Sequence, residues 1–91
     1  MRLGPWEIDL VARRGDLVVI VEVRTRGRGS QQGPFESVSG RKRLLLKKAA
    51  RRLWREKLVK LAGVERVRID VAAVWFDAEP PRVEYVEGAI T

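Results

Sequence analysis

The sequence contains no cysteine and no histidine. These absences exclude disulfide bonds, zinc sites built on cysteine or histidine, cysteine nucleophiles and Ser-His-Asp catalysis. Asparagine is also missing, which is typical of thermophile proteins, although a GC-rich genome biases composition in the same way. A metal site in this chain is therefore expected to use oxygen ligands.

Long apolar segments are also missing. No apolar run approaches the roughly 20 residues of a membrane-spanning helix, and the first five residues are too polar for a signal peptide. With 91 residues, the chain forms one domain over 1–91. We therefore expect a cytoplasmic protein with no membrane contact.

Positive charge is abundant. The net charge is +7 and the isoelectric point is about 10.8. Such an excess on a small domain attracts polyanions through its long-range field and through counterion release. A solubilising surface and an anionic membrane are weaker explanations. We expect a nucleic-acid partner, with DNA favoured over RNA.

Five segments have the periodicity of regular structure. They are strands over 6–13 and 17–26, a helix over 41–62, a strand over 67–76 and a short edge strand over 82–86. Ser39 is a suitable N-cap for the helix, and Gly63 a suitable glycine after its end. The glycine-rich stretch 27–40 is predicted to be a loop. The order β-β-α-β-β predicts an α/β domain with a mixed sheet and one long helix against it.

Three carboxylates interrupt the apolar strands, namely Asp9, Glu22 and Asp70. An ionised carboxylate is costly to bury, so each needs a cation, a metal ion or hydrogen bonds. We expect Asp70 to pair with a buried arginine. If Arg14-Gly15 is a two-residue turn, Glu7 lies opposite Glu22 with Asp9 diagonal to it, about 7–8 Å away.

Oxygen ligands without histidine or cysteine indicate Mg²⁺ or Mn²⁺ as the cofactor. The competing interpretation places Glu7 and Glu22 in ion pairs with arginines on a solvated sheet face. The separation of Asp9 from Glu22-Val23-Arg24 favours the metal, because it nearly spells the D…(D/E)-x-K pattern of Mg²⁺-dependent nucleases.

The predicted helix is strongly basic. Ten of the twenty residues from Arg41 to Lys60 are lysine or arginine, and one is acidic. A solvated outer face usually mixes both signs, so this excess favours phosphate binding. The residues expected to bind nucleic acid are Arg41, Lys42, Arg43, Lys47, Lys48, Arg51, Arg52 and Arg55.

Several segments resemble the YraN family of bacterial proteins. Residues 6–12, WEIDLVA, are similar to the family's G-E-I-D-L-I-A, and residues 21–26, VEVRTR, to its V-E-V-K-T-R. The similarity continues through residues 34–38, 41–43 and 68–74, so it covers nearly the whole chain. Members of this family resemble the PD-(D/E)XK superfamily, which includes Holliday-junction resolvases and restriction enzymes.

The resemblance implies a restriction-endonuclease-like fold and a site. Asp9 and Glu22 would bind the metal with the Val23 carbonyl, Arg24 would occupy the position of the motif lysine, and Glu7 could assist. Arginine stays protonated, so Arg24 is a poor proton acceptor. The helix and strand that precede the first motif in the family are missing here, so we expect a homodimer that covers the exposed surface.

Two functions of different classes therefore remain open. One is a Mg²⁺-dependent endonuclease acting on structured or branched DNA. The other is a DNA- or RNA-binding accessory protein that keeps the nuclease fold without cleavage. Asp9 and Glu22 favour the first, and Arg24 with the short N-terminus favours the second. Binding of a protein partner through an exposed edge is less favoured, because it leaves the positive charge unexplained.

Overall fold

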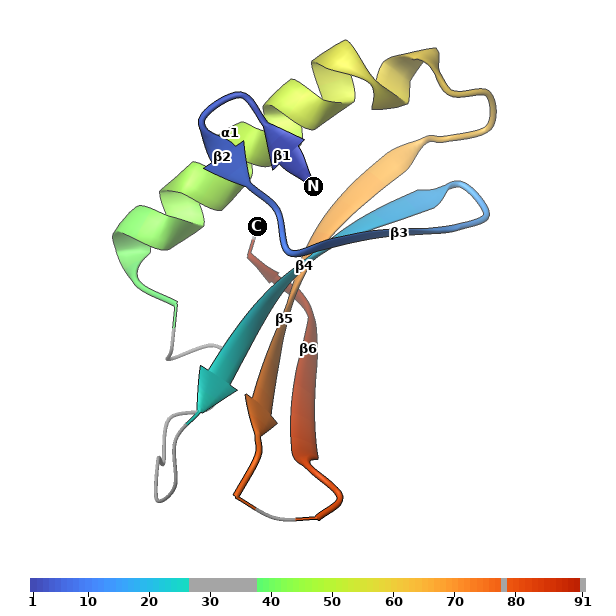
Figure 1. Cartoon of the computed structure of the whole chain (residues 1–91). Helices are drawn as coiled ribbons and strands as arrows, with labels where there is room; N and C mark the ends of the chain where they lie inside the picture. Colours follow the sequence, from blue (N-terminus) through green and yellow to red (C-terminus); the bar gives the residue numbers. More distant parts are fainter. Residues whose placement is uncertain (27–37, 78, 91) are drawn as a thin grey trace.

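A computed structural model describes residues 1–26, 38–77 and 79–90 of the chain (Figure 1). Its elements are β1 (Arg2–Leu3), β2 (Trp6–Glu7), β3 (Leu10–Arg14), β4 (Leu17–Arg26), α1 (Gly40–Glu56), the 3₁₀ turn η1 (Leu58–Lys60), β5 (Arg66–Trp75) and β6 (Arg82–Ile90). The predicted loop over 27–40 lies outside the described residues except for its last three positions. Within the described ranges, no helix has the length and apolarity needed to cross a membrane.

One four-stranded sheet forms the centre of the molecule, in the order β3-β4-β5-β6. The β4 and β5 strands are parallel, whereas β3 and β6 pair antiparallel with their neighbours. The α1 helix crosses one face of this sheet, and the small β1–β2 hairpin lies beside the helix (Figure 1). The predicted α/β class, mixed sheet and β-β-α-β-β order are confirmed, with the β1–β2 hairpin as an addition.

The β3–β4 hairpin turns at Gly15-Asp16, where Arg14 pairs with Leu17. Gly15 has φ +59°, the positive value that a II′ turn requires at its first central position and that glycine adopts without strain. The Arg14-Gly15 turn was therefore wrong, because it places arginine at that position. The observed pairing of β3 with β4 differs from the expected pairing by two residues. Because side chains alternate with a period of two, each one stays on the sheet face where it was expected.

The strand predicted over 6–13 is interrupted at Ile8. The Ile8 side chain is 1% exposed and belongs to the core. Its backbone pairs with Met1, where the Met1 amino group donates to the Ile8 carbonyl at 2.7 Å and the Ile8 N–H donates to the Met1 carbonyl at 2.6 Å. A continuous strand was therefore wrong, because burial of Ile8 bends the chain. Asp9 lies in this bend.

The basic helix is shorter than predicted. Ser39 is the N-cap, as expected, and its Oγ accepts a hydrogen bond from the Lys42 N–H at 3.2 Å. The helix ends at Glu56 rather than near residue 62, and the chain continues in η1, so Gly63 follows that turn and not the helix. At about 1.5 Å per residue, its 17 residues span roughly 26 Å. The buried helix positions are Leu46, Ala49, Ala50 and Leu53.

The main core lies between α1 and the sheet. Ile20 and Val71 are fully buried on neighbouring strands, and Leu53 packs against them from the helix. Trp75, the last residue of β5, is 3% exposed and also belongs to the interior. The opposite sheet face is less covered. Its small cluster of Val19, Val21 and Ala72 is bordered by exposed apolar side chains, namely Leu10, Val23, Val83 and Tyr85.

Asp70 is fully buried and joins β5 to β6. Its carboxylate accepts two hydrogen bonds from Arg68, at 2.8 and 3.0 Å, one from the Tyr85 hydroxyl at 2.5 Å and one from the Gly88 N–H at 2.8 Å. Gly88 has φ +58°, a backbone conformation that glycine adopts without strain. The predicted pairing with arginine is confirmed, although Arg68 is one third exposed. Asp70 is therefore a structural residue.

Replacing Asp70 with alanine is expected to lower the free energy of unfolding by about 2–3 kcal/mol, because four hydrogen-bond donors on three residues lose their acceptor. Thermal unfolding should show a fall in Tm of roughly 10 °C or more. Asp77→Ala, at an exposed position, is the control and should leave the Tm within about 2 °C. Equal Tm values for the two variants would contradict the assigned role.

The pH dependence provides a second readout for Asp70. Burial alone would raise the pKa of Asp70, but the hydrogen bonds from Arg68, Tyr85 and Gly88 bring it below its ordinary value of 3.8. A carboxylate with a lowered folded-state pKa stabilises the fold above that ordinary value, and this contribution disappears as the pH falls through the lowered pKa. The stability difference between the wild type and Asp70→Ala should therefore shrink below about pH 4.

Candidate active site

Glu22 is a carboxylate placed in the interior by strand alternation. It shares the helix-covered face of β4 with Val18 and Ile20, and its side chain is 4% exposed. Figure 1 shows that α1 begins at the end of the sheet where β4 ends. The first turn of the helix therefore lies near Glu22, as ion-pair geometry confirms.

Two cations approach one oxygen of this carboxylate. Arg24 Nη1 is 3.7 Å and Lys42 Nζ is 3.6 Å from Glu22 Oε1. Burial raises the pKa of Glu22, and the nearby Asp9 carboxylate raises it further, whereas Lys42 and Arg24 act in the opposite direction. The net result is a raised pKa, so the ionised form of Glu22 is held at an energetic cost.

Asp9 lies next to Glu22, as strand parity predicted. Leu10 of β3 pairs with Val21 of β4. Asp9 precedes Leu10 and Glu22 follows Val21, so these two residues come next beyond that pair on the two sides of the hairpin. The Asp9 Oδ2 atom accepts a hydrogen bond from the Val23 N–H at 2.9 Å. This bond holds the Asp9 carboxylate against the backbone of β4, so the two motif acids share one site.

Glu7 is not part of this pair. Its predicted position opposite Glu22 was wrong, because the observed turn shifts the hairpin register. The Glu7 side chain is 72% exposed and pairs with Arg2 at 3.2 Å. It lines a pocket of about 170 Å³ together with Lys42, which is its connection to the site. A direct catalytic role for Glu7 stays a prediction.

The donor chemistry of Asp9 and Glu22 fits a hard divalent cation, since both offer carboxylate oxygens. Within the described ranges, no group of three or more acidic, histidine or cysteine side chains is gathered for metal binding. A cation held here would therefore have two carboxylates from the described protein, with backbone oxygens such as the Val23 carbonyl as further ligands. The role of that carbonyl stays a prediction.

Arg24 stands where the motif has lysine. Its side chain is one third exposed, and its Nε atom is buried without a hydrogen-bond partner among the residues described. Strand alternation places Arg24 on the helix side of the sheet, next to Glu22. Its guanidinium can hold a carboxylate or a phosphate, but it keeps its proton.

Lys42 is the site residue whose position the sequence reasoning missed. It was assigned to the nucleic-acid surface of the helix and not to the acid pair. The Ser39 N-cap was the available indication of this position, because a helix capped at Ser39 has Lys42 in its first turn. A helix that returns over the sheet from the end of β4 begins beside Glu22.

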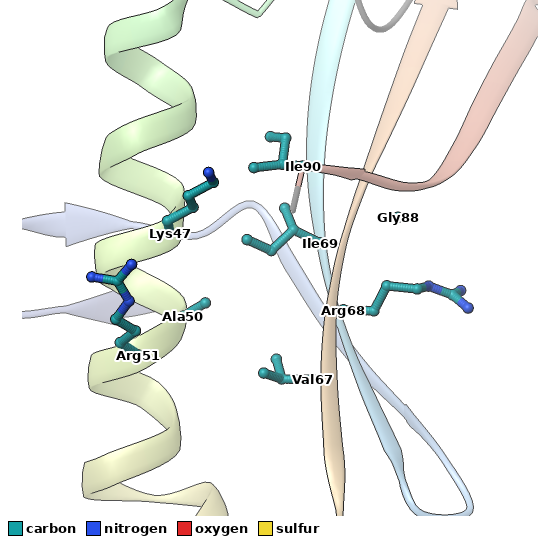
Figure 2. Close-up of a pocket in the computed structure, with 8 residues that line it drawn as sticks. All are labelled: Lys47, Ala50, Arg51, Val67, Arg68, Ile69, Gly88 and Ile90. Carbon is teal, nitrogen blue, oxygen red and sulfur yellow. The ribbon is translucent and has the colours of Figure 1, made fainter.

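The remaining basic residues follow α1 away from the acid pair. Lys47 and Arg51 line a groove of about 360 Å³ between the helix and the sheet, and Figure 2 shows Val67, Ile69 and Ile90 pointing from the sheet into it. Arg68 also lines this groove but extends away from the helix in that view. A second hollow on the helix surface is lined by Lys48, Arg51, Arg52, Arg55 and Glu56.

Besides Lys42, two more of the predicted binding residues have internal partners. The Arg52 Nε atom donates to both carboxylate oxygens of Glu56 at 3.1 Å. The Arg43 Nε atom donates to the Val38 carbonyl at 3.1 Å. Arg41, Lys48, Arg51 and Arg55 are exposed, so they are the helix positions most accessible to a polyanion.

Comparison with known proteins places the chain in a family. The model of the uncharacterised protein family UPF0102 matches residues 1–74. The chain belongs to UPF0102. This membership confirms the resemblance to the YraN family.

UPF0102 relatives occur in several bacterial groups. The chain is 48% identical over 75 residues to a UPF0102 protein of Sorangium cellulosum (strain So ce56), covering 82% of this chain and 52% of that protein. It is 44% identical over 85 residues to one of Moorella thermoacetica, covering 91% and 68%. The chain therefore spans about half of the first relative and two thirds of the second. No solved structure matches the chain.

Proposed function

We propose that this UPF0102 protein binds nucleic acid along α1 and hydrolyses phosphodiester bonds of structured or branched DNA at Asp9 and Glu22, with Mg²⁺ or Mn²⁺ as cofactor. The observation that carries the proposal is the buried Glu22 carboxylate beside Asp9, at the start of a basic helix. Clustered groups with shifted pKa values are frequent at functional sites.

The fold supports the same proposal. A mixed four-stranded sheet with one helix against it, and with Asp9 and Glu22 side by side at the open end of the β3–β4 hairpin, is consistent with a restriction-endonuclease-like core. The finer assignment to that fold, and the reaction class, rest on the family resemblance.

The residues of the site have separate tasks in this mechanism. Asp9 and Glu22 would hold the divalent cation, which supplies Lewis-acid polarisation of the phosphate when bound. The hydrogen bond from the Val23 N–H fixes one Asp9 oxygen, and burial fixes Glu22. Arg24 and Lys42 place positive charge at Glu22, beside the position where negative charge accumulates in the transition state. The exposed arginines and lysines of α1 bind the backbone on either side.

Binding without cleavage is the second candidate function. Arg24 at the lysine position favours it, as does the lack of a third acidic ligand among the residues described. In that case the helix surface would bind DNA or RNA, and the carboxylates would have only a structural role.

The deciding experiment combines calorimetry and cleavage. Mg²⁺ and Mn²⁺ are titrated into the wild-type protein, which is then incubated with branched and linear DNA at low salt. We expect saturable metal binding and metal-dependent cleavage, with the branched substrate cut faster. DNA binding with no cleavage in either metal would overturn the hydrolytic proposal and leave the binding function.

We also propose that the protein is a homodimer. Leu10, Val23, Val83 and Tyr85 expose apolar surface on the sheet face away from α1, and a second copy would remove it from water. Light scattering at micromolar concentration should give twice the chain mass of 10.4 kDa. A monomer mass would contradict this proposal and leave the nuclease proposal unaffected.

A further inference from the structure

The position of Lys42 is fixed by the start of the helix. The Ser39 side chain caps α1 through the Lys42 N–H, so the backbone of Lys42 is anchored in the first turn. From this anchor the Lys42 ammonium reaches within 3.6 Å of Glu22. Its side chain is 37% exposed, so the ammonium lies where it can meet both the buried carboxylate and a bound ligand.

Arg24 and Lys42 contact the same oxygen but differ chemically. Arginine has a planar, permanently charged group, and the Arg24 Nε atom is buried. Lysine has a compact ammonium on a flexible four-carbon chain with three donors. The ammonium can keep one donor toward Glu22 and turn another toward a phosphate oxygen. Arg24, whose planar guanidinium has a buried Nε atom, is better suited to holding Glu22 in place.

We propose that Lys42, rather than Arg24, supplies the cation that contacts the phosphate bound at Asp9 and Glu22. The lysine that the family motif has on the strand is thus provided by the first turn of the helix. This inference rests on the proposed function and assigns a catalytic residue to it. Arg24 becomes a positioning residue for Glu22.

The test compares Lys42→Met with Lys60→Met. Lys60 is exposed in η1 and lies outside the proposed site, so it controls for loss of one positive charge. At saturating branched DNA, single-turnover cleavage should fall roughly 100-fold in Lys42→Met and stay within about twofold in Lys60→Met. The slope of log affinity against log salt should decrease by about one in Lys42→Met only. Circular dichroism checks that both variants fold.

A lysine at position 24, where the family motif has lysine, provides an independent test. If Lys42 already provides the ammonium, Arg24→Lys should give no gain in cleavage over the wild type. A tenfold or larger gain in Arg24→Lys, with Lys42→Met cleaving normally, would overturn the inference while leaving the nuclease function intact.

A failure of the proposed nuclease function can be distinguished from a failure of the inference about Lys42. If the wild type cleaves nothing, the hydrolytic proposal fails, and the salt slope alone decides whether Lys42 contacts phosphate. An unchanged slope in Lys42→Met would then overturn the inference. A decrease by about one, absent in Lys60→Met, would uphold the phosphate contact.

Discussion

Glu22→Gln is expected to reduce cleavage at saturating DNA by roughly 10³-fold or more. The Lewis acidity of a bound metal ion is worth several kcal/mol in the transition state, and each 1.4 kcal/mol or so changes the rate tenfold. Glutamine has nearly the shape of glutamate, but it offers one neutral oxygen in place of a charged pair. Calorimetry should show Mn²⁺ affinity falling together with the cleavage rate.

The fold should tolerate this substitution. Since burial raises the pKa of Glu22, the native protein holds the ionised carboxylate at a cost that glutamine does not incur. Arg24 and Lys42 are each about one third exposed, so water can solvate them when the charge is removed. We expect the free energy of unfolding to change by less than about 1 kcal/mol.

A matched control is Glu84→Gln, an identical change at an exposed position of β6. It should cleave at the wild-type rate. DNA affinity without metal should stay within about twofold for both variants, because binding is assigned to the helix surface. Undiminished cleavage by Glu22→Gln would remove Glu22 from the site.

Replacing Lys47, Lys48 and Arg51 together with glutamine is expected to weaken DNA binding on the order of 10²–10³-fold at 0.1 M salt. Each phosphate contact contributes about 0.9 to the slope of log affinity against log salt, so the slope should decrease by nearly three. Lys47 and Arg51 line the groove beside the sheet, and Lys48 lines the neighbouring hollow with Arg51. Fluorescence anisotropy at several salt concentrations would measure both quantities.

The control for net charge is a second triple variant with the same residue types. Arg14, Lys57 and Lys60 are exposed outside the proposed surface, and their replacement with glutamine removes the same three charges. This variant should keep its affinity within about fivefold, through the weaker long-range field alone. Equal losses in the two variants would mean that the total charge, and not the helix surface, determines binding.

The sequence predicted the layers of the fold because side-chain periodicity determines which residues face the core. Strand alternation placed Glu22 and Arg24 on one face, and helical spacing placed Leu46, Ala49, Ala50 and Leu53 against the sheet. The β4 strand has the predicted bounds, residues 17–26. These features depend on local pattern, so they could be predicted without tertiary information.

Features that depend on three-dimensional packing were predicted less well. The Arg14-Gly15 turn placed arginine at a position that needs positive φ, and the bend at Ile8 depends on a pairing with Met1 that no local pattern indicates. The early end of α1 was missed because Leu58 remains buried in η1 and prolongs the apolar periodicity. Lys42 was placed on the helix but not beside Glu22, because their proximity depends on how the helix returns over the sheet.

The parallel pairing of β4 with β5 has a consequence for how the chain is made. Arg66 and Asp16, whose side chains are joined at 3.1 Å, are fifty residues apart in sequence. During synthesis the β3–β4 hairpin is therefore made well before β5. Until β5 is made, the valine-rich β4 strand has one unpaired edge. Such segments aggregate unless charges interrupt them. Glu22 and Arg24 are charges in the second half of β4, and charges placed in or beside an apolar strand limit its aggregation while it is unpaired.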